Sequence, residues 1–436
     1  PASLCEFDGA FEIAFDETGP SAYQRHEPAG DFSVDLRDAT TFTLSERWTG
    51  CENYIFLPHW ITVSAQDSSS VWTTGVDELI ARSPANAHYF FVVVGSSSDD
   101  AESFGSAIQL DIDATLASMT ADDAAFWGER LHVAAQPSDE IGGLIGTVFS
   151  KTIGSYGFAV DRFQKLRTLG SFASVEAYDS ALNDNGDWPF EQRLFSAAYE
   201  SEYLNYEATR HWEMAQVEVT EVVLFDGDVY EYYEDGTAVF PDAATMAGFD
   251  TLEIDVQMEC PDKDGYEFGN CGEWDYLAYL WLYDENTKSW WEISRFITTY
   301  HRESRWLVDA SHALPWLVAG GEQLLRYEWT PSWNTQPTGI TVKLRLSNQR
   351  SKTPVQTIPL FEGGAFDSTY NDRDPIEVEI PSEATRVEIV ALITGHGMDA
   401  ENCAEFCDHE HHYYVGQNHA YEWHPIVDDP RGCENE

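Results

Sequence analysis

The stretch Thr251-Leu252-Glu253-Ile254-Asp255-Val256 decides the fold of the second half of the chain, because its apolar and polar residues alternate without a break. Successive side chains of a β-strand point to opposite faces of a sheet, so the apolar set would line a buried face. Val217–Val222 and Ile340–Leu346 follow the same pattern. Several short strands of this kind, with few helices between them, predict an antiparallel β-sandwich.

Further predicted strands lie on the C-terminal side of this stretch. The aromatic-rich runs Tyr276–Tyr283 and Trp290–Phe296 flank a polar turn at Asp284–Lys288, an order that predicts a β-hairpin. Ile376–Ile380 and Arg386–Ile393 are the last predicted strands. They would begin a second sandwich near residue 371 that is incomplete where the chain stops. We therefore expect a longer protein, whose C-terminal remainder could be a second chain.

Residues 1–215 have a different pattern, which is typical of an α/β domain. Tyr54–Leu57 and Tyr89–Val94 are continuous apolar runs, as expected of strands buried on both faces. Val76–Arg82 and Asp122–Leu131 have helical spacing. Alternating strands and helices predict a parallel or mixed sheet.

This N-terminal region resembles the thioredoxin and peroxiredoxin folds through Asp31–Leu36, Phe42–Ser45 and Phe158–Arg167. The stretch after Phe56 reads Leu-Pro-His-Trp-Ile-Thr and holds no C-x-x-C, so redox chemistry is not expected. We therefore predict an accessory, redox-inactive, thioredoxin-like domain over residues 1–215.

Acidic residues dominate the charge: 76 Asp and Glu stand against 24 Lys and Arg, a formal net charge of -52. Nucleic acid is not an expected partner, because binding its phosphates needs clusters of Lys and Arg. No run of about eighteen apolar residues exists, so we expect no membrane span. Aromatic residues make up 14% of the chain, a surplus that suits a β protein or a sugar-binding one.

Two close pairs of cysteines, Cys260 with Cys271 and Cys403 with Cys407, have spacings that suit disulfides. Such pairs in a chain with few other thiols indicate an oxidising compartment, so we expect a secreted or periplasmic protein. Cys5 and Cys51 would form a third bond. Zinc is the alternative, but no further close pair completes a tetrahedral set of ligands.

Acidic motifs accompany both of these pairs. Glu273-Trp274-Asp275 follows the first pair, and Glu405 lies inside Cys403-Ala404-Glu405-Phe406-Cys407. We expect Glu273, Trp274 and Asp275 to begin a strand, with Glu273 and Asp275 on one face. In this order the motifs resemble the peptide-N-glycosidase F family, bacterial amidases that remove whole N-linked glycans from asparagine. The resemblance implies two jelly rolls, here residues 216–370 and 371–436, without a cofactor or metal. It also implies an N-glycoprotein or glycopeptide substrate held at its chitobiose core.

The resemblance assigns roles to individual residues. Asp275 would be the principal catalytic residue, Glu405 would assist it through water, and Glu328 would be a third acid. Crowded acids raise one another's pKa, so one of them could stay protonated and serve the leaving nitrogen. Four further residues would bind the sugar, namely Glu273, Trp274, Trp329 and His396. The family's cysteine partner for Cys433 is absent from this chain.

Two departures from the family pattern bear on the site. Phe406 replaces a tryptophan and loses its N–H donor, and Tyr276 replaces the arginine that follows the family's aspartate. Two other functions stay open. A glycan-binding module without activity would keep the aromatic residues and lose the chemistry. A copper-dependent monooxygenase-like protein would use the acid and histidines near the C-terminus, namely Asp408, His409, His411, His412, His419 and His424.

Overall fold

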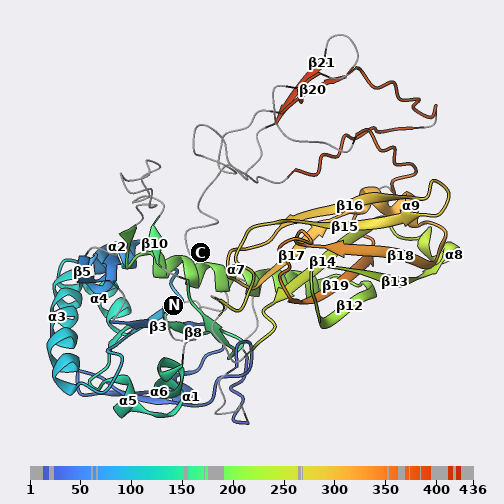
Figure 1. Ribbon diagram of the computed structural model, residues 1–436. Helices are drawn as coiled ribbons and strands as arrows, with labels where there is room; N and C mark the ends of the chain where they lie inside the picture. Colours follow the sequence, from blue (N-terminus) through green and yellow to red (C-terminus); the bar gives the residue numbers. More distant parts are fainter. Residues whose placement is uncertain are drawn as a thin grey trace.

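The computed structural model has two well-defined parts, an α/β part at the N-terminus and a β-sandwich, with helix α7 (Ser196–Gln216) running between them (Figure 1). The structure describes residues 13–18, 24–59, 62–64, 67–151, 156–170, 172–174, 191–263, 267, 269–350, 353–361, 369–372, 374–382, 384–393, 411–415 and 419–423. The C-terminal half of α7 contacts the sandwich directly. Arg210 donates to the carbonyl of Arg305 at 2.8 Å, and Arg345 donates to that of Met214 at 3.1 Å.

The α/β part is built on a mixed five-stranded sheet of order β7-β6-β3-β8-β9. Three strands are parallel to their neighbours and the last two form an antiparallel extension. The strands are β3 (Asn53–Pro58), β6 (Ala87–Val92), β7 (Leu131–Val133), β8 (Phe158–Val160) and β9 (Leu166–Thr168). β3 and β6 are buried along their whole length, as their continuous apolar runs predict. The mixed sheet is thus confirmed, while the thioredoxin-like assignment stays a prediction.

Helices cover both faces of this sheet. Side chains of α2, α3 and α7 pack on one face around Ile55 and Tyr89, and α6 packs on the other face around Phe56 and Phe90. The helices within the described residues are α1 (Leu44–Arg47), α2 (Val76–Arg82), α3 (Ser98–Ala117), α4 (Ala121–Gly128), α5 (Ser138–Ile141), α6 (Gly143–Ser150), α7, α8 (Ala243–Met246) and α9 (Leu314–Leu317), with short 3-10 turns η1 (Val71–Thr73) and η4 (Ser311–Ala313). The two helices predicted from spacing are α2 and α4.

The sandwich has the strand order of a jelly roll. Its two sheets have the orders β12-β19-β14-β17 and β13-β18-β15-β16, and all neighbouring strands are antiparallel. If β12 to β19 are numbered 1 to 8, these orders read 1-8-3-6 and 2-7-4-5. The strands are β12 (Thr220–Tyr230), β13 (Tyr233–Asp242), β14 (Thr251–Glu259), β15 (Leu277–Asp284), β16 (Ser289–Ile297), β17 (Ser304–Asp309), β18 (Gly320–Glu328) and β19 (Thr338–Ser347). The alternation in Thr251–Val256 works as predicted, because Leu252, Ile254 and Val256 lie in the shared core.

Short two-stranded pairings complete the described structure. They are β1 (Ser33–Asp35) with β2 (Thr41–Thr43), β4 (Thr62–Ser64) with β5 (Asp67–Ser70), β10 (Ala173–Ser174) with β11 (Glu191–Gln192), and β20 (His411–Val415) with β21 (His419–Trp423). The strands predicted at 376–380 and 386–393 are absent from the described residues of those segments. Ile376, Val378 and Val387 are exposed there. Alternation alone does not make a strand, because a strand also needs a hydrogen-bonded neighbour.

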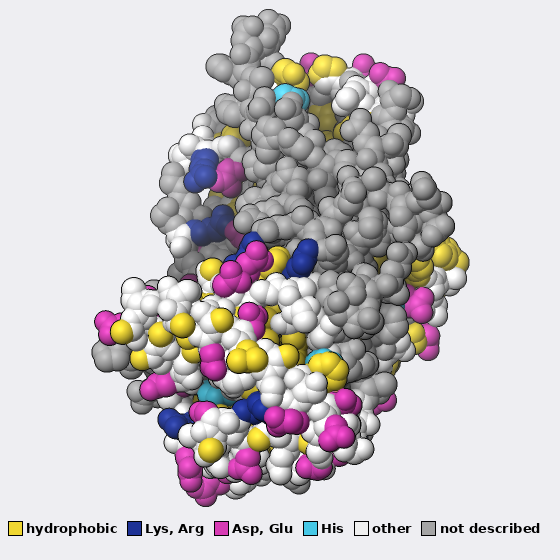
Figure 2. Space-filling view, turned by 90° about the vertical axis from the view of Figure 1, so that its left-hand side faces the viewer, with side chains coloured by type: hydrophobic (Ala, Val, Ile, Leu, Met, Phe, Trp, Pro, Cys, Tyr) yellow, Lys and Arg dark blue, Asp and Glu magenta, His cyan; other side chains and the backbone are white. Residues whose placement is uncertain are grey.

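The surface agrees with the acidic composition. Figure 2 shows Asp and Glu side chains spread over the face that the N-terminal part presents, with few Lys and Arg between them. In the part of the chain that the structure describes, no helix combines the length and the apolar character that crossing a membrane requires.

Candidate functional site

The loop between β14 and β15 is closed by the Cys260–Cys271 disulfide. The two Cα atoms are 4.6 Å apart, so this predicted disulfide is confirmed. Inside the loop, the amides of Asn270 and Cys271 both donate to the carbonyl of Glu267, at 3.0 and 2.8 Å. The disulfide thus restrains the two ends of the loop, and a hydrogen-bonded backbone turn restrains its interior.

Asp275 follows this loop, two residues before β15 begins, and its exposed fraction is 9%. Thr298 holds the backbone on both sides of it. The Thr298 hydroxyl accepts from the amide of Tyr276 at 2.7 Å and donates to the carbonyl of Trp274 at 2.9 Å. A third bond runs from the amide of His301 to the carbonyl of Gly272, at 2.8 Å. The backbone around the candidate catalytic carboxylate is therefore fixed by a different loop, residues 298–303.

The expectation that Glu273, Trp274 and Asp275 begin a strand is wrong. β15 starts at Leu277, and the preceding residues bond to the 298–303 loop instead of a neighbouring strand. Glu273 and Trp274 are both exposed, whereas Asp275 is nearly buried, so Glu273 and Asp275 do not share a face. Strand alternation does not apply to a segment that has no ladder.

Two exposed indoles flank the segment that holds Asp275: Trp274 precedes it in the chain, and Trp333 packs on Tyr276, which follows it. Trp274 is 50% exposed and Trp333, in the turn between β18 and β19, is 78% exposed. The Trp333 ring meets the Tyr276 ring edge to face at 6.0 Å, and the side-chain NH2 of Asn334 donates to the Tyr276 hydroxyl at 2.7 Å. Trp333 was not among the site residues expected from the sequence. The signal was a tryptophan inside the turn-forming stretch Pro331–Pro337, where an apolar ring has no core to fill.

Glu328 is the last residue of β18 and is half-buried. It pairs with Tyr279 of β15 across the sheet, so Asp275 lies four residues earlier on the neighbouring segment. Both acids are therefore at the same end of the same sheet. Four residues of fully extended chain span at most roughly 14 Å.

The outer face of the sheet around Glu328 is rich in aromatic and cationic groups. Tyr279 stacks on Trp281 with ring centres 5.1 Å apart, and Arg295 lies 5.3 Å from the Tyr279 ring. Burial raises the pKa of Tyr279; the Arg295 guanidinium counters this, and the Glu328 carboxylate adds to the rise. Arg326 lies over Trp290 on the same sheet, at 4.5 Å. Such a face can stack on sugar rings and donate hydrogen bonds to their oxygens.

Trp329 does not fit the role expected of it. Its side chain has 0% exposure, lies in the sandwich core beside Tyr327, and donates its indole N–H to the carbonyl of Gln336 at 3.0 Å. Strand alternation turns it away from Glu328, toward the inside of the sandwich. A side chain without exposed surface cannot stack on a sugar, so Trp329 supports the core instead.

Several predicted residues fall outside the described part of the chain. Cys51 takes part in a disulfide, while its expected partner Cys5 is outside the described residues. The same holds for the site residues Glu405 and His396, the pair Cys403 and Cys407, and Cys433, Phe406, Asp408, His409 and His424. The described part of the candidate site therefore comes from the sandwich and the loops that flank its strands.

The described residues offer little for a metal ion. One group of possible ligands lies close together, namely Cys260, Cys271 and Glu303. The two sulfurs are bonded to each other, and Glu303 bonds to Arg25 and His26. Beside them is a cavity of about 20 Å³ lined by Cys271, Thr298, Arg302 and others, which has room for about one water and none for a sugar.

Comparisons with known proteins agree with the motifs. The family model described as the C-terminal part of peptide-N-glycosidase F matches residues 366–435. Peptide-N(4)-(N-acetyl-beta-D-glucosaminyl)asparagine amidase F of Elizabethkingia miricola is 23% identical over 209 residues. That alignment covers 42% of this chain and 54% of the relative, so the chain spans about half the relative's length. The resemblance to the peptide-N-glycosidase F family is thus confirmed.

Similar solved structures include peptide-N-glycosidase F from Flavobacterium meningosepticum, described as a glycosylasparaginase. It is 23% identical, covers 31% of this chain and 43% of that chain, and has a TM-score of 0.25. A carbohydrate-binding domain, CBM36-1 of a multidomain xylanase from a Trinervitermes trinervoides hindgut metagenome, is 10% identical and covers 29% and 96%, with a TM-score of 0.18. Scores this low add nothing to the fold assignment, which rests on the strand order.

Proposed function

We propose that this chain contributes to a peptide-N-glycosidase that hydrolyses the amide between asparagine and the first GlcNAc of an N-linked glycan. The glycan would leave intact and the asparagine would become aspartate. One observation supports this most: Thr298 holds the backbone on both sides of Asp275 at the exit of a disulfide-closed loop. Of the two exposed indoles, Trp274 precedes Asp275 and Trp333 packs on Tyr276. The motif match and the related amidase support the same reaction.

The chemistry needs a base for water, a proton for the leaving nitrogen, and a grip on the sugar. In the proposal, the Asp275 carboxylate takes the proton from the attacking water. Glu405 serves as the partner acid or orients the water, and Glu328 lies farther along the sheet as the third acid. Trp274 and Trp333 would hold the chitobiose rings, with Glu273 as a polar contact. His396 is proposed for the same subsite.

The rigid backbone around Asp275 suits this role. A catalytic carboxylate must be held in a narrow range of positions, since a displacement of about 1 Å can cost about a hundredfold in rate. The three bonds from Thr298 and His301 restrain the segment without using the Asp275 side chain.

The experiment is deglycosylation of a denatured N-glycoprotein by the full natural protein that contains these residues, followed by mass spectrometry. Amidase activity leaves aspartate at the former glycan site, so the peptide is about one mass unit heavier than the same peptide with asparagine. Cleavage that leaves one GlcNAc on asparagine would instead identify an endoglycosidase. Binding of the glycan without release would identify a glycan-binding module.

The decisive variant is Asp275→Asn, which keeps the shape of the side chain and removes the base. We expect glycan release to be abolished while folding is retained. Asp228→Asn is the matched control, because Asp228 is an exposed strand residue of the other sheet and loses the same charge. Near-normal glycan release by Asp275→Asn would refute the assignment of Asp275 as the base.

A further inference from the structure

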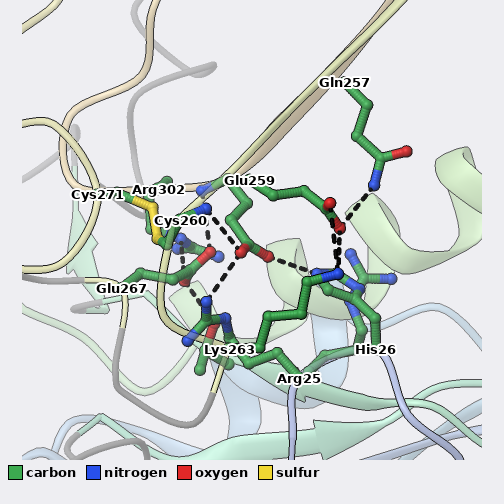
Figure 3. A network of polar contacts seen from close by, with 12 residues as sticks. Arg25, His26, Gln257, Glu259, Cys260, Lys263, Glu267, Cys271 and Arg302 are labelled. Atoms are coloured by element: carbon green, nitrogen blue, oxygen red, sulfur yellow. Dashed lines mark hydrogen bonds and ion pairs between the residues drawn. A yellow bond between two sulfur atoms is a disulfide. The ribbon is translucent and has the colours of Figure 1, made fainter. Parts of the chain in front are cut away.

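The N-terminal part and the disulfide loop meet in a buried network of charges. Arg25, which lies in a turn before β1, is only 1% exposed. Its guanidinium donates to the Glu303 carboxylate and to the carbonyl of Asp262, both at 2.9 Å. His26 contacts the other oxygen of Glu303 at 2.5 Å. Figure 3 shows Arg25 and His26 reaching the disulfide region from one side.

A second set of contacts reaches the same region from β9 and α7. Glu267, inside the disulfide loop, accepts a hydrogen bond from the Thr168 hydroxyl and pairs with Arg302 at 2.9 Å. Arg302 in turn lies 4.0 Å from the carboxylate of Glu200, a buried residue of α7. Separate elements of the N-terminal part therefore supply charged or polar groups to one place on the sandwich.

These groups converge on the loop that holds the candidate catalytic segment. Arg302 and Glu303 are the last two residues of the 298–303 loop, and Thr298 is the first. Glu303 also accepts from the amide of Cys260 at 3.0 Å, and its own amide donates to Glu267 at 3.0 Å. One short loop thus bonds to the N-terminal part at one end and to the backbone around Asp275 at the other.

The network is charged under ordinary conditions. Burial alone would raise the pKa of Glu303, but the His26 hydrogen bond and the charges of His26 and Arg25 lower it to about 2. A buried carboxylate held in its ionised form needs its partners in place, so losing Arg25 would force the loop to rearrange. Charged hydrogen bonds also fix direction, which an apolar contact between domains does not.

We propose that the N-terminal part positions the catalytic segment of the sandwich: Arg25 and His26, through Glu303, hold the 298–303 loop and thereby Thr298 and the Asp275 backbone. Arg25 is then a positioning residue of the active site, although it lies 250 residues from Asp275 in the chain. This inference rests on the proposed function for its effect on catalysis. Its structural link can be tested without any activity.

The structural test measures hydrogen exchange of the Tyr276 and His301 amides, which bond to Thr298 and Gly272. In Arg25→Ala we expect both amides to exchange at least about tenfold faster, while amides in the middle of β14 keep their protection. Arg210→Ala is the matched control. It removes another arginine between the same two parts, bonded to the β17 backbone and outside the 298–303 loop.

The kinetic test uses glycopeptide hydrolysis by the full protein. We expect Arg25→Ala to lower kcat by roughly 30-fold with KM nearly unchanged, as a displaced catalytic group would. Added guanidinium ion at millimolar concentration should restore part of kcat in Arg25→Ala and none in Arg210→Ala. If Arg25→Ala folds poorly, Arg25→Lys keeps the charge without the planar fork and should give an intermediate loss.

The outcomes separate the two proposals. Unchanged exchange at Tyr276 and His301 in a folded Arg25 variant would overturn the positioning link, whatever the enzyme does. Equal losses in the Arg25 and Arg210 variants, without rescue, would also overturn it, since both would then act through general stability. If Arg25→Ala shows the faster exchange but the wild-type protein releases no glycan, the amidase is refuted and the positioning link stands.

Discussion

Thr298→Val tests whether the segment around Asp275 depends on one hydroxyl. Valine keeps the shape of threonine but removes the oxygen that accepts from Tyr276 and donates to Trp274, at 2.7 and 2.9 Å. Each such bond contributes about 1 kcal/mol net, and the amide left without its acceptor adds a further cost of about 1 kcal/mol. We therefore expect the free energy of unfolding to fall by about 2–3 kcal/mol.

The assay is urea unfolding, together with kcat on a glycopeptide. With an m-value of about 3 kcal/mol/M, a loss of this size lowers the midpoint by roughly 0.7–1 M. Thr298→Ser is the control, because serine keeps the hydroxyl and loses one methyl, which is worth about 0.8 kcal/mol. The serine variant should retain most of kcat and the valine variant should not. Equal damage in the two variants would refute the role of the hydroxyl and attribute the effect to packing.

Three further predictions follow from the same region. Trp333→Ala should raise KM about tenfold with kcat little changed, because it removes a binding surface worth about 1.4 kcal/mol and no reacting group; a normal KM would contradict this. Glu303→Gln should make the free energy of unfolding less dependent on pH in the acid range. The pKa of Glu303 is about 2 in the folded protein and ordinarily 4.5. Its carboxylate therefore stabilises the fold above about pH 4.5, and this stabilisation is lost as the pH falls toward 2. Urea midpoints between about pH 5 and pH 2 measure it. A chelator should leave glycan release unchanged, and a loss reversed by added copper would favour the monooxygenase-like alternative.

The strands of the sandwich could be predicted from the sequence because their signal is local. Alternation in Thr251–Val256 and the polar turn at Asp284–Lys288 each depend on neighbours within a few residues, and β14, β15 and β16 form there. The same local signal at Ile376–Ile380 was not sufficient. Pairing requires a second strand, and its position is not encoded in the alternation of the first.

The site was harder to predict because its geometry depends on distant residues. The sequence predicts a strand from Glu273 to Asp275. In the structure, Thr298, more than twenty positions later, bonds to the backbone on both sides of Asp275 instead. Trp329 and Trp333 show the same limit. Trp329, the first residue after β18, lies in the core, whereas Trp333, farther along the following turn, is exposed to solvent. The difference depends on where β18 ends. The Arg25 to Glu303 ion pair joins residues 278 positions apart, so no motif could reveal it.

The disulfide alone would not orient the Asp275 carboxylate, which we propose as the catalytic base. It restrains the ends of the loop from Cys260 to Cys271, but Asp275 lies four residues beyond the second sulfur, where the chain could still turn. The 298–303 loop removes that freedom, and charged residues of the N-terminal part in turn restrain this loop. In our proposal, the orientation of Asp275 therefore depends on contacts outside the sandwich. The N-terminal part would then do more than attach to the sandwich, because an ion pair at 2.9 Å defines both distance and direction.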